Sequence, residues 1–208
     1  MDGAKKGQKM MKDNHRKLIY TAMFAAIVVV LQLFVSIPLG PMFTITLTLV
    51  PVMLGAILFG PSSGAILGGV FGVVVAIQVI TGAAGPASTM MLTQAPVTTI
   101  ILCILKGAVA GLVSGLVYKA IMKFEKPRLA VILSAVSCPI VNTGIFCLGL
   151  TVFYNNLLNE WAIGEGYANA FTFIMLGMIG LNFVIEFAVN VLLIPVSLRL
   201  IKIVKQRL

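Results

Sequence analysis

The sequence predicts an all-α integral membrane protein with six transmembrane helices and both termini in the cytoplasm. Hydrophobic residues make up 60% of the 208 residues and charged residues only 10%, whereas soluble domains are about half apolar and a quarter charged. The chain has room for several helices of about 20 residues, the length that crosses a hydrocarbon core of about 30 Å. Its basic residues gather at a few places between long apolar stretches. We therefore expect a multi-pass protein.

The apolar segments and the breaks between them give the expected organisation. Residues 1–17 form a basic cytoplasmic tail, and residues 18–208 form a single six-helix membrane domain. The expected helices occupy residues 18–36, 44–59, 64–82, 97–122, 129–154 and 170–201. The connecting sequences contain turn residues or charges. They are "IPLGP" at 37–41, "TGAAGPASTMMLTQAP" at 81–96, "KFEKPR" at 123–128 and "NNLLNEWAIGEGYANA" at 155–170.

The positions of lysine and arginine predict the orientation. They occur in residues 5–17, 119–128 and 199–207, with Lys106 as the single exception. The loops on the other side of the expected membrane contain neither residue; these are 37–43, 83–96 and 155–169. By the positive-inside rule, both termini and the 119–128 turn face the cytoplasm.

Small residues recur at four-residue spacing in three of the expected helices. They are Ala22 and Ala26 in the first, Gly64, Gly68 and Gly72 in the third, and Gly107, Gly111 and Gly115 in the fourth. Small residues on one face of a membrane helix allow close approach of another helix backbone. We expect the glycines to pack helices within the subunit.

The ordered combination of these features resembles the substrate-binding S components of energy-coupling factor (ECF) transporters. The A-x-x-x-A pattern lies at 22–26, near the cytoplasmic end of the first helix. "TITLTLVPVMLGAILFGPSSGAILGGVFGV" at 44–73 resembles the second and third helices of that family, and "CPIVNTGIFCLG" at 138–149 resembles the fifth. The resemblance covers nearly the whole chain from about residue 17.

The resemblance implies a mechanism, a location and partners. An S component of a prokaryotic plasma membrane binds a vitamin or related micronutrient from outside and docks on a transmembrane scaffold driven by two cytoplasmic ATPases. Carried over to this sequence, Ala22 and Ala26 are the docking positions. The chain contains no G-x-x-x-x-G-K-[ST] motif, the phosphate-binding loop of many ATPases. ATP hydrolysis is therefore expected from partner subunits, and no cofactor is expected in this chain.

Three polar residues are expected at similar depths in the last three helices. Counting about 1.5 Å per residue from the outer ends puts Lys106 at roughly 14 Å, and Asn142 and Asn182 at roughly 18 Å. Polar groups at membrane depth are costly and therefore indicate function. The resemblance implies that these helices, covered by the outer loops, form the substrate pocket.

A lysine beside two carboxamides favours an acidic or polar-acyl substrate, because an ammonium makes charge-assisted hydrogen bonds with a carboxylate. Pantothenate is therefore preferred over riboflavin. Alternatively, Lys106 pairs with Glu186, which lies one helical turn beyond Asn182. The two asparagines are equally suited to hydrogen bonds between helices.

The outer loops supply three more candidate substrate-binding residues. Gln78 and Gln94 flank the 81–96 loop, which in the resembling family closes over the pocket. Trp161 is predicted either to stack on a substrate ring or to anchor its loop at the membrane–water interface.

Other classes of function have less support. The three cysteines lack CxxC spacing and the single histidine lies in the basic tail, so no metal site is indicated. No nucleophile–base pair points to an enzyme. The main alternative is a small oligomeric channel or an ion-coupled secondary carrier. Such carriers usually show internal repeats and several intramembrane acids, whereas Glu186 is the only such acid expected here.

Overall fold

The computed structural model describes residues 2–35, 37–38, 44–45 and 47–207. Its helices are α1 (Asp2–Phe34), α2 (Leu49–Phe59), α3 (Pro61–Ile80), α4 (Pro86–Gln94), α5 (Pro96–Met122), α6 (Pro127–Phe153), α7 (Asn155–Gly164), α8 (Ala170–Thr172), the π-helix η1 (Phe173–Met178), α9 (Gly180–Leu192) and α10 (Ile194–Arg207). The strands β1 (Ile37–Pro38) and β2 (Thr44–Ile45) pair antiparallel. Apart from this two-residue ladder, the all-α prediction is confirmed.

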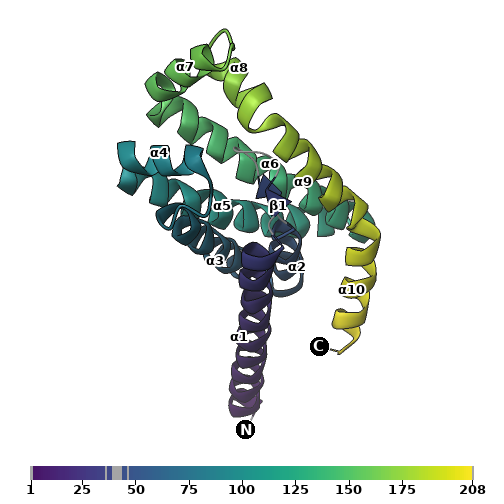
Figure 1. Cartoon of the computed structure of the whole chain (residues 1–208). Coiled ribbons are helices and arrows are strands. Elements are labelled where there is room, and N and C mark those ends of the chain that lie inside the picture. Colours follow the sequence, from purple (N-terminus) through teal and green to yellow (C-terminus); the bar gives the residue numbers. More distant parts are fainter. Residues whose placement is uncertain (1, 36, 39–43, 46, 208) are drawn as a thin grey trace.

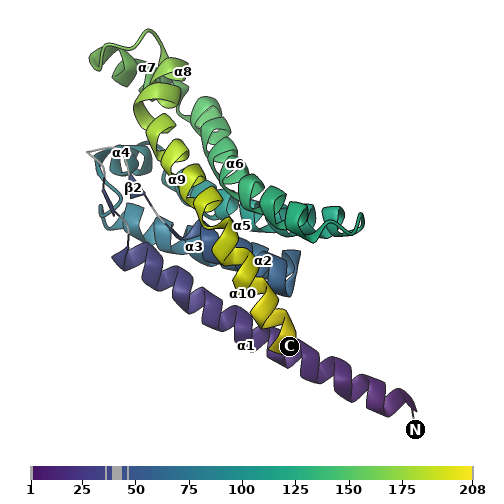
Figure 2. The same cartoon turned by 90° about the vertical axis from the view of Figure 1, so that its right-hand side faces the viewer.

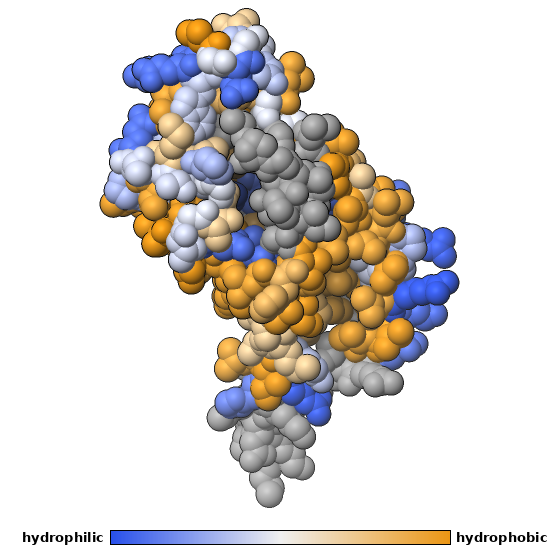
Figure 3. All heavy atoms as spheres, viewed as in Figure 1, coloured by the Kyte–Doolittle hydropathy of each residue, from blue (hydrophilic) through white to orange (hydrophobic). Residues whose placement is uncertain are grey.

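Both termini lie toward one end of the molecule, whereas α4, α7 and α8 lie toward the other (Figures 1 and 2). We call the latter the α7 end. The predicted basic tail continues the first helix, and α1 runs along α2 and α3 and then beyond them to the N-terminus (Figure 2). Hydrophobic residues cover the middle of the face in Figure 3, and hydrophilic residues gather at the α7 end. An apolar middle is what a protein in lipid requires.

Proline marks the start of four helices, namely α3, α4, α5 and α6. Proline suits the first helical turn because its missing N–H has no intrahelical partner there. Gly60 and Gly85, just before α3 and α4, have a φ of 95°, a conformation that side chains with a Cβ rarely adopt. The local sequence therefore determines where these helices begin.

Four described helices are long and apolar enough to cross a membrane: the His15–Phe34 part of α1, α3, α5 and α6. Residues Phe183–Leu192 and Ile194–Val204 make a fifth span if a bent pair counts as one, with a bend of 48° between them. Pro195 accounts for the bend, because proline cannot donate to the carbonyl four residues earlier and its ring clashes with it. Six spans are therefore not confirmed.

The second predicted span differs most from the structure. Its helix, α2, has 11 residues and is about 16 Å long, roughly half a hydrocarbon core. The threonine-rich start of the predicted segment forms β2 and a turn instead. Nearly all of α2 is buried, because it packs among α1, α3, α5 and α6.

The two glycine repeats bring the backbones of α3 and α5 into contact. A Cβ atom added at Gly64 would overlap the carbonyl of Gly111, and one added at Gly68 would overlap the carbonyl of Gly107. A Cβ at Gly115 would collide with Pro61 at the start of α3. The predicted role of the glycines in packing within the subunit is confirmed.

A pair of serines joins α5 to α6. The hydroxyl oxygens of Ser114 and Ser134 lie 2.8 Å apart, and each lies within 3.1 Å of the other residue's carbonyl oxygen. Both side chains are fully buried, so these hydrogen bonds satisfy polar groups that would otherwise be costly in an apolar interior.

One face of α1 packs on α2 and α3. The ring of Tyr20 stacks on Phe59 at 5.8 Å between centroids, and Phe24 meets the same ring edge-on at 5.5 Å. The Thr21 hydroxyl donates to Ser63 Oγ at 3.2 Å. The opposite face of α1, which includes Ala22 and Ala26, is exposed.

Candidate functional site

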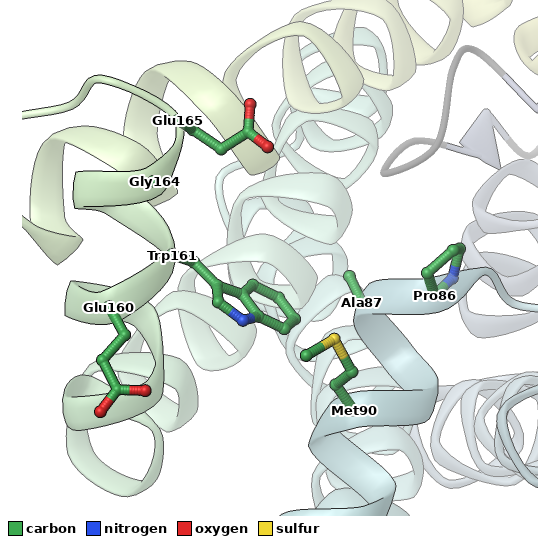
Figure 4. Close-up of a pocket in the computed structure, with 7 residues that line it drawn as sticks. All are labelled: Pro86, Ala87, Met90, Glu160, Trp161, Gly164 and Glu165. Atoms are coloured by element: carbon green, nitrogen blue, oxygen red, sulfur yellow. The ribbon is translucent and has the colours of Figure 1, made fainter.

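A pocket of about 350 Å³ opens at the α7 end, between α4 and α7 (Figure 4). Its lining residues come from these two helices and the residue after α7: Pro86, Ala87, Met90, Glu160, Trp161, Gly164 and Glu165. The Trp161 ring and the Met90 side chain point toward each other across the pocket, and the two glutamates flank the tryptophan. A volume of this size is within the range of small-molecule sites.

Buried hydrogen bonds fix the helices that carry the lining. Tyr154, the residue before α7, is 0% exposed. Its hydroxyl oxygen lies 2.6 Å from Thr99 Oγ1 and 3.2 Å from the carbonyl oxygen of Ala95, at the junction of α4 and α5. On the other side of α7, Asn159 Oδ1 accepts from the backbone N–H of Ala170 at 2.8 Å. The two walls of the pocket are therefore joined to each other and to α8.

A buried apolar cluster adjoins the pocket. It includes Met91 of α4, Leu150 and Tyr154, Leu158 of α7, and Phe173 of η1, and Trp161 packs against it. Such packing holds the tryptophan in one position, which a ring-stacking residue needs in order to recognise a flat ligand.

The pocket carries negative charge without a positive counterpart. Glu160 and Glu165 are exposed, and the segments 83–96 and 155–169 that surround them contain no lysine, arginine or histidine. Among the described residues, neither carboxylate has an ion pair or a hydrogen bond. The site is therefore suited to a ligand that brings positive charge or hydrogen-bond donors.

Of the predicted substrate-binding residues whose side chains the structure describes, Trp161 alone lines this pocket. Gln94 is exposed at the end of α4, outside the lining. Gln78 is occupied with Gln32 of α1: Gln32 Nε2 donates to Gln78 Oε1 at 2.9 Å, and Gln78 Nε2 donates to the Gln32 carbonyl at 3.2 Å. Gln32 also accepts from the Thr48 hydroxyl at 2.9 Å. These contacts give Gln78 a role in joining α1 to α3.

Lys106 and Asn142 lie outside the pocket lining. The Lys106 Nζ atom sits over the Phe146 ring, 4.2 Å from its centroid, and Asn142 is one turn before Phe146 on α6. Asn142 is 7% exposed, and its Oδ1 atom is buried with no hydrogen-bond partner among the described residues. The sequence did not predict the aromatic ring that Lys106 contacts, and the expected shared site of Lys106 and Asn142 stays a prediction.

The alternative ion pair between Lys106 and Glu186 is not formed in the structure. Within the part of the chain that the structure describes, no carboxylate lies within ion-pair distance of Lys106. Glu186 is buried on α9, where its backbone carbonyl accepts from Asn190 Nδ2 at 2.8 Å. The side chain of Asn182 lies outside the described residues, so its predicted role is open.

Sequence reasoning missed Met90, Glu160 and Glu165 as members of the site. The signal in the sequence is the spacing E-W-x-x-x-E at 160–165, which puts two acids beside the only tryptophan. Met90 could not be assigned without knowing that residues 86–94 form a helix facing α7. No group of three or more histidine, cysteine, aspartate or glutamate residues suited to a metal occurs among the described residues.

Comparison with known proteins bears on both family and fold. The sequence model of the family described as "ECF transporter, substrate-specific component" matches residues 16–198. Among solved structures, ThiT from Listeria monocytogenes is similar, with a TM-score of 0.61 and 21% sequence identity over 91% of this chain and 98% of that chain. At this identity the similarity shows a common fold. No curated protein has significant sequence similarity to the chain.

Proposed function

Because the chain belongs to the family of ECF transporter substrate-specific components, we propose that it is the high-affinity vitamin-binding subunit of an ECF-type ABC importer. The family makes it a transporter subunit rather than an enzyme, and its apolar helices make it a multi-pass membrane protein. We place it in the plasma membrane of a prokaryote. A vitamin, a transmembrane scaffold subunit and two ATPase subunits are the proposed partners.

The observation that carries the proposal is the pocket at the α7 end. It lies away from the chain termini and from the basic α5–α6 turn (Figure 1). If basic segments face the cytoplasm, the pocket opens to the outside, where an importer must capture its substrate. A membrane channel needs a continuous path instead, so the family match and this pocket favour a binding subunit over a small channel or carrier.

The fold supports six membrane-associated segments with both termini inside. In this arrangement α2, preceded by the β1–β2 ladder, is the second segment. Its 11 residues need not meet lipid at both faces, since they are buried among other helices. The bent pair α9–α10 is the sixth segment, and it returns the chain to the side of the N-terminus.

The exposed face of α1 supports the proposed docking of the scaffold. Ala22 and Ala26 are both exposed and lie one turn apart, while the opposite face of the helix is used for packing within the subunit. Small side chains allow another helix backbone to approach closely. We propose that the scaffold packs against these two alanines.

The choice of pantothenate ahead of riboflavin depends on Lys106. Its ammonium contacts a ring face and no carboxylate among the described residues, but it lies outside the pocket lining. Pantothenate therefore has less support than the vitamin-binding role itself. The buried Asn142 Oδ1 atom has no hydrogen-bond partner within the part of the chain that the structure describes. Gln78 and Gln94 have less support, because the first is hydrogen-bonded to α1 and the second is exposed.

Identification of a co-purifying small molecule tests the proposed function directly. The protein should be purified in mild detergent from cells grown in rich medium, and bound molecules should be released and identified by mass spectrometry. We expect one water-soluble vitamin at close to one molecule per chain, together with scaffold and ATPase subunits when these are co-expressed. Absence of any vitamin and of any ATPase partner would contradict the proposal.

A further inference from the structure

The α4–α7 pocket combines an aromatic face with uncompensated negative charge. Trp161 presents its ring to the cavity opposite Met90 (Figure 4). Glu165 extends on one side of the ring, and Glu160, on the other side, turns its carboxylate away from the ring. The chain has six acidic residues in total, so a third of them line this one pocket. No basic residue occurs in either segment that forms its walls.

This combination recognises a positively charged flat ring. The face of a tryptophan is the strongest aromatic partner for a cation, and it also stacks on other flat rings. Two carboxylates nearby attract a cation and repel an anion, and the effect is larger in a partly enclosed site than in bulk water. The ring and the charge of the ligand are thus selected by different residues of the same pocket.

A bare metal ion does not fit the same residues. Calcium needs six to eight oxygen ligands and magnesium needs six, whereas two exposed carboxylates are the only anionic groups in the lining. The remaining lining residues carry no charge: Pro86, Ala87, Met90, Trp161 and Gly164. Apolar surface stabilises an organic ligand and contributes nothing to a hydrated ion.

We propose that this pocket selects a vitamin or related micronutrient that carries a positively charged heteroaromatic ring. The inference rests on the proposed function and names the substrate class of its site. It differs from the expectation of a substrate carboxylate at Lys106, because the negative charge of the two lining glutamates disfavours an anion. Lys106 does not line the pocket, whereas Trp161 does.

Trp161 is the only tryptophan in the chain, so its fluorescence reports on this pocket alone. Three probes share one pyridine ring and differ in charge: 1-methylnicotinamide is a cation, nicotinamide is neutral and nicotinate is an anion. In a titration of the purified full-length protein, we expect saturable quenching with half-saturation at least about tenfold lower for the cation than for the neutral ring. Nicotinate should bind most weakly. Saturation distinguishes binding from collisional quenching, which rises linearly with concentration.

A double charge-neutralising variant and a control variant test whether the two glutamates cause the preference for the cation. Glu160→Gln combined with Glu165→Gln should reduce the cation preference to about twofold or less and leave nicotinamide binding within twofold of the original value. Glu125→Gln is the control for the kind of substitution, since it removes one negative charge from the α5–α6 turn, outside the pocket. It should leave all three titrations unchanged.

The results that would overturn the inference differ from those that would overturn the proposed function. Equal affinity for the three probes, stronger binding of nicotinate, or no saturable binding of the cation would overturn the selection of a ring cation. Co-purification of pantothenate would also overturn it, while leaving the proposed function intact. A failure to find any bound vitamin or ATPase partner would contradict the proposed function itself.

Discussion

At the scale of single residues, Lys106 places a positive charge within the apolar run of α5. Its ammonium lies over the Phe146 ring at 4.2 Å, on a helix that is apolar enough to cross a membrane. A cation–π contact contributes about 0.5–2 kcal/mol, with the larger values where water is excluded. The ring therefore offsets part of the cost of holding a charge within an apolar helix. A structural role and a substrate-binding role of Lys106 lead to different predictions.

A double-mutant cycle separates the two roles of Lys106. Lys106→Met keeps the length and apolar stem of the side chain, and Phe146→Leu removes the ring. We expect the two changes to be non-additive in the free energy of unfolding by about 0.5–2 kcal/mol, measured by reversible unfolding in detergent. Binding of the co-purified vitamin is the second readout. A substrate contact would appear as at least a tenfold loss of affinity in Lys106→Met that Phe146→Leu does not share, and additive effects on stability would contradict the contact.

At the scale of helices, the α3–α5 contact depends on glycine at particular positions. Gly68→Ala places a Cβ atom against the carbonyl of Gly107, so the helices must separate, and overpacking of this kind costs about 1–3 kcal/mol. Gly69→Ala is a matched control on the next residue, where an added Cβ meets nothing within 4 Å. It should be neutral or stabilising by up to about 1 kcal/mol, because alanine favours a helix more than glycine does. Equal destabilisation by both changes would show that the glycine contact is not formed.

The helices that coincide with one long apolar run were predicted well from the sequence. The expected spans 64–82, 97–122 and 129–154 correspond to α3, α5 and α6 to within a few residues, because long apolar runs begin at prolines and end at turn residues. Helices α4 and α7 were not predicted, since both are short and only moderately apolar. The break at Leu193 was also missed, although Pro195 was a visible signal for it.

At the scale of the whole molecule, the site was harder to predict than the fold because it depends on how separate segments meet. Trp161 was chosen from its residue type and its place in an expected outer loop, and it lines the pocket. Met90 lies about 70 residues away in the sequence, and only the packing of α4 near α7 brings the two together. Gln78 was placed near the substrate because it flanks a loop, yet its hydrogen bonds go to Gln32. The position and rotation of each helix relative to its neighbours decide which side chains meet, and a hydropathy pattern does not give that information.

The exposed face of α1 gives a prediction about the assembled transporter. Ala26→Trp adds a large side chain where we propose that the scaffold helix approaches, so ATP-driven uptake of the vitamin should fall at least tenfold. Affinity of the isolated subunit for the vitamin should stay within about twofold, because Ala26 is exposed and α1 does not line the pocket. Ile27→Trp is the matched control, since Ile27 is also exposed but points about 100° away around the helix. Uptake by proteoliposomes containing the complete transporter, measured beside vitamin binding by the subunit alone, distinguishes the outcomes. Equal loss of uptake in both variants, or loss of vitamin binding in Ala26→Trp, would contradict docking at this face.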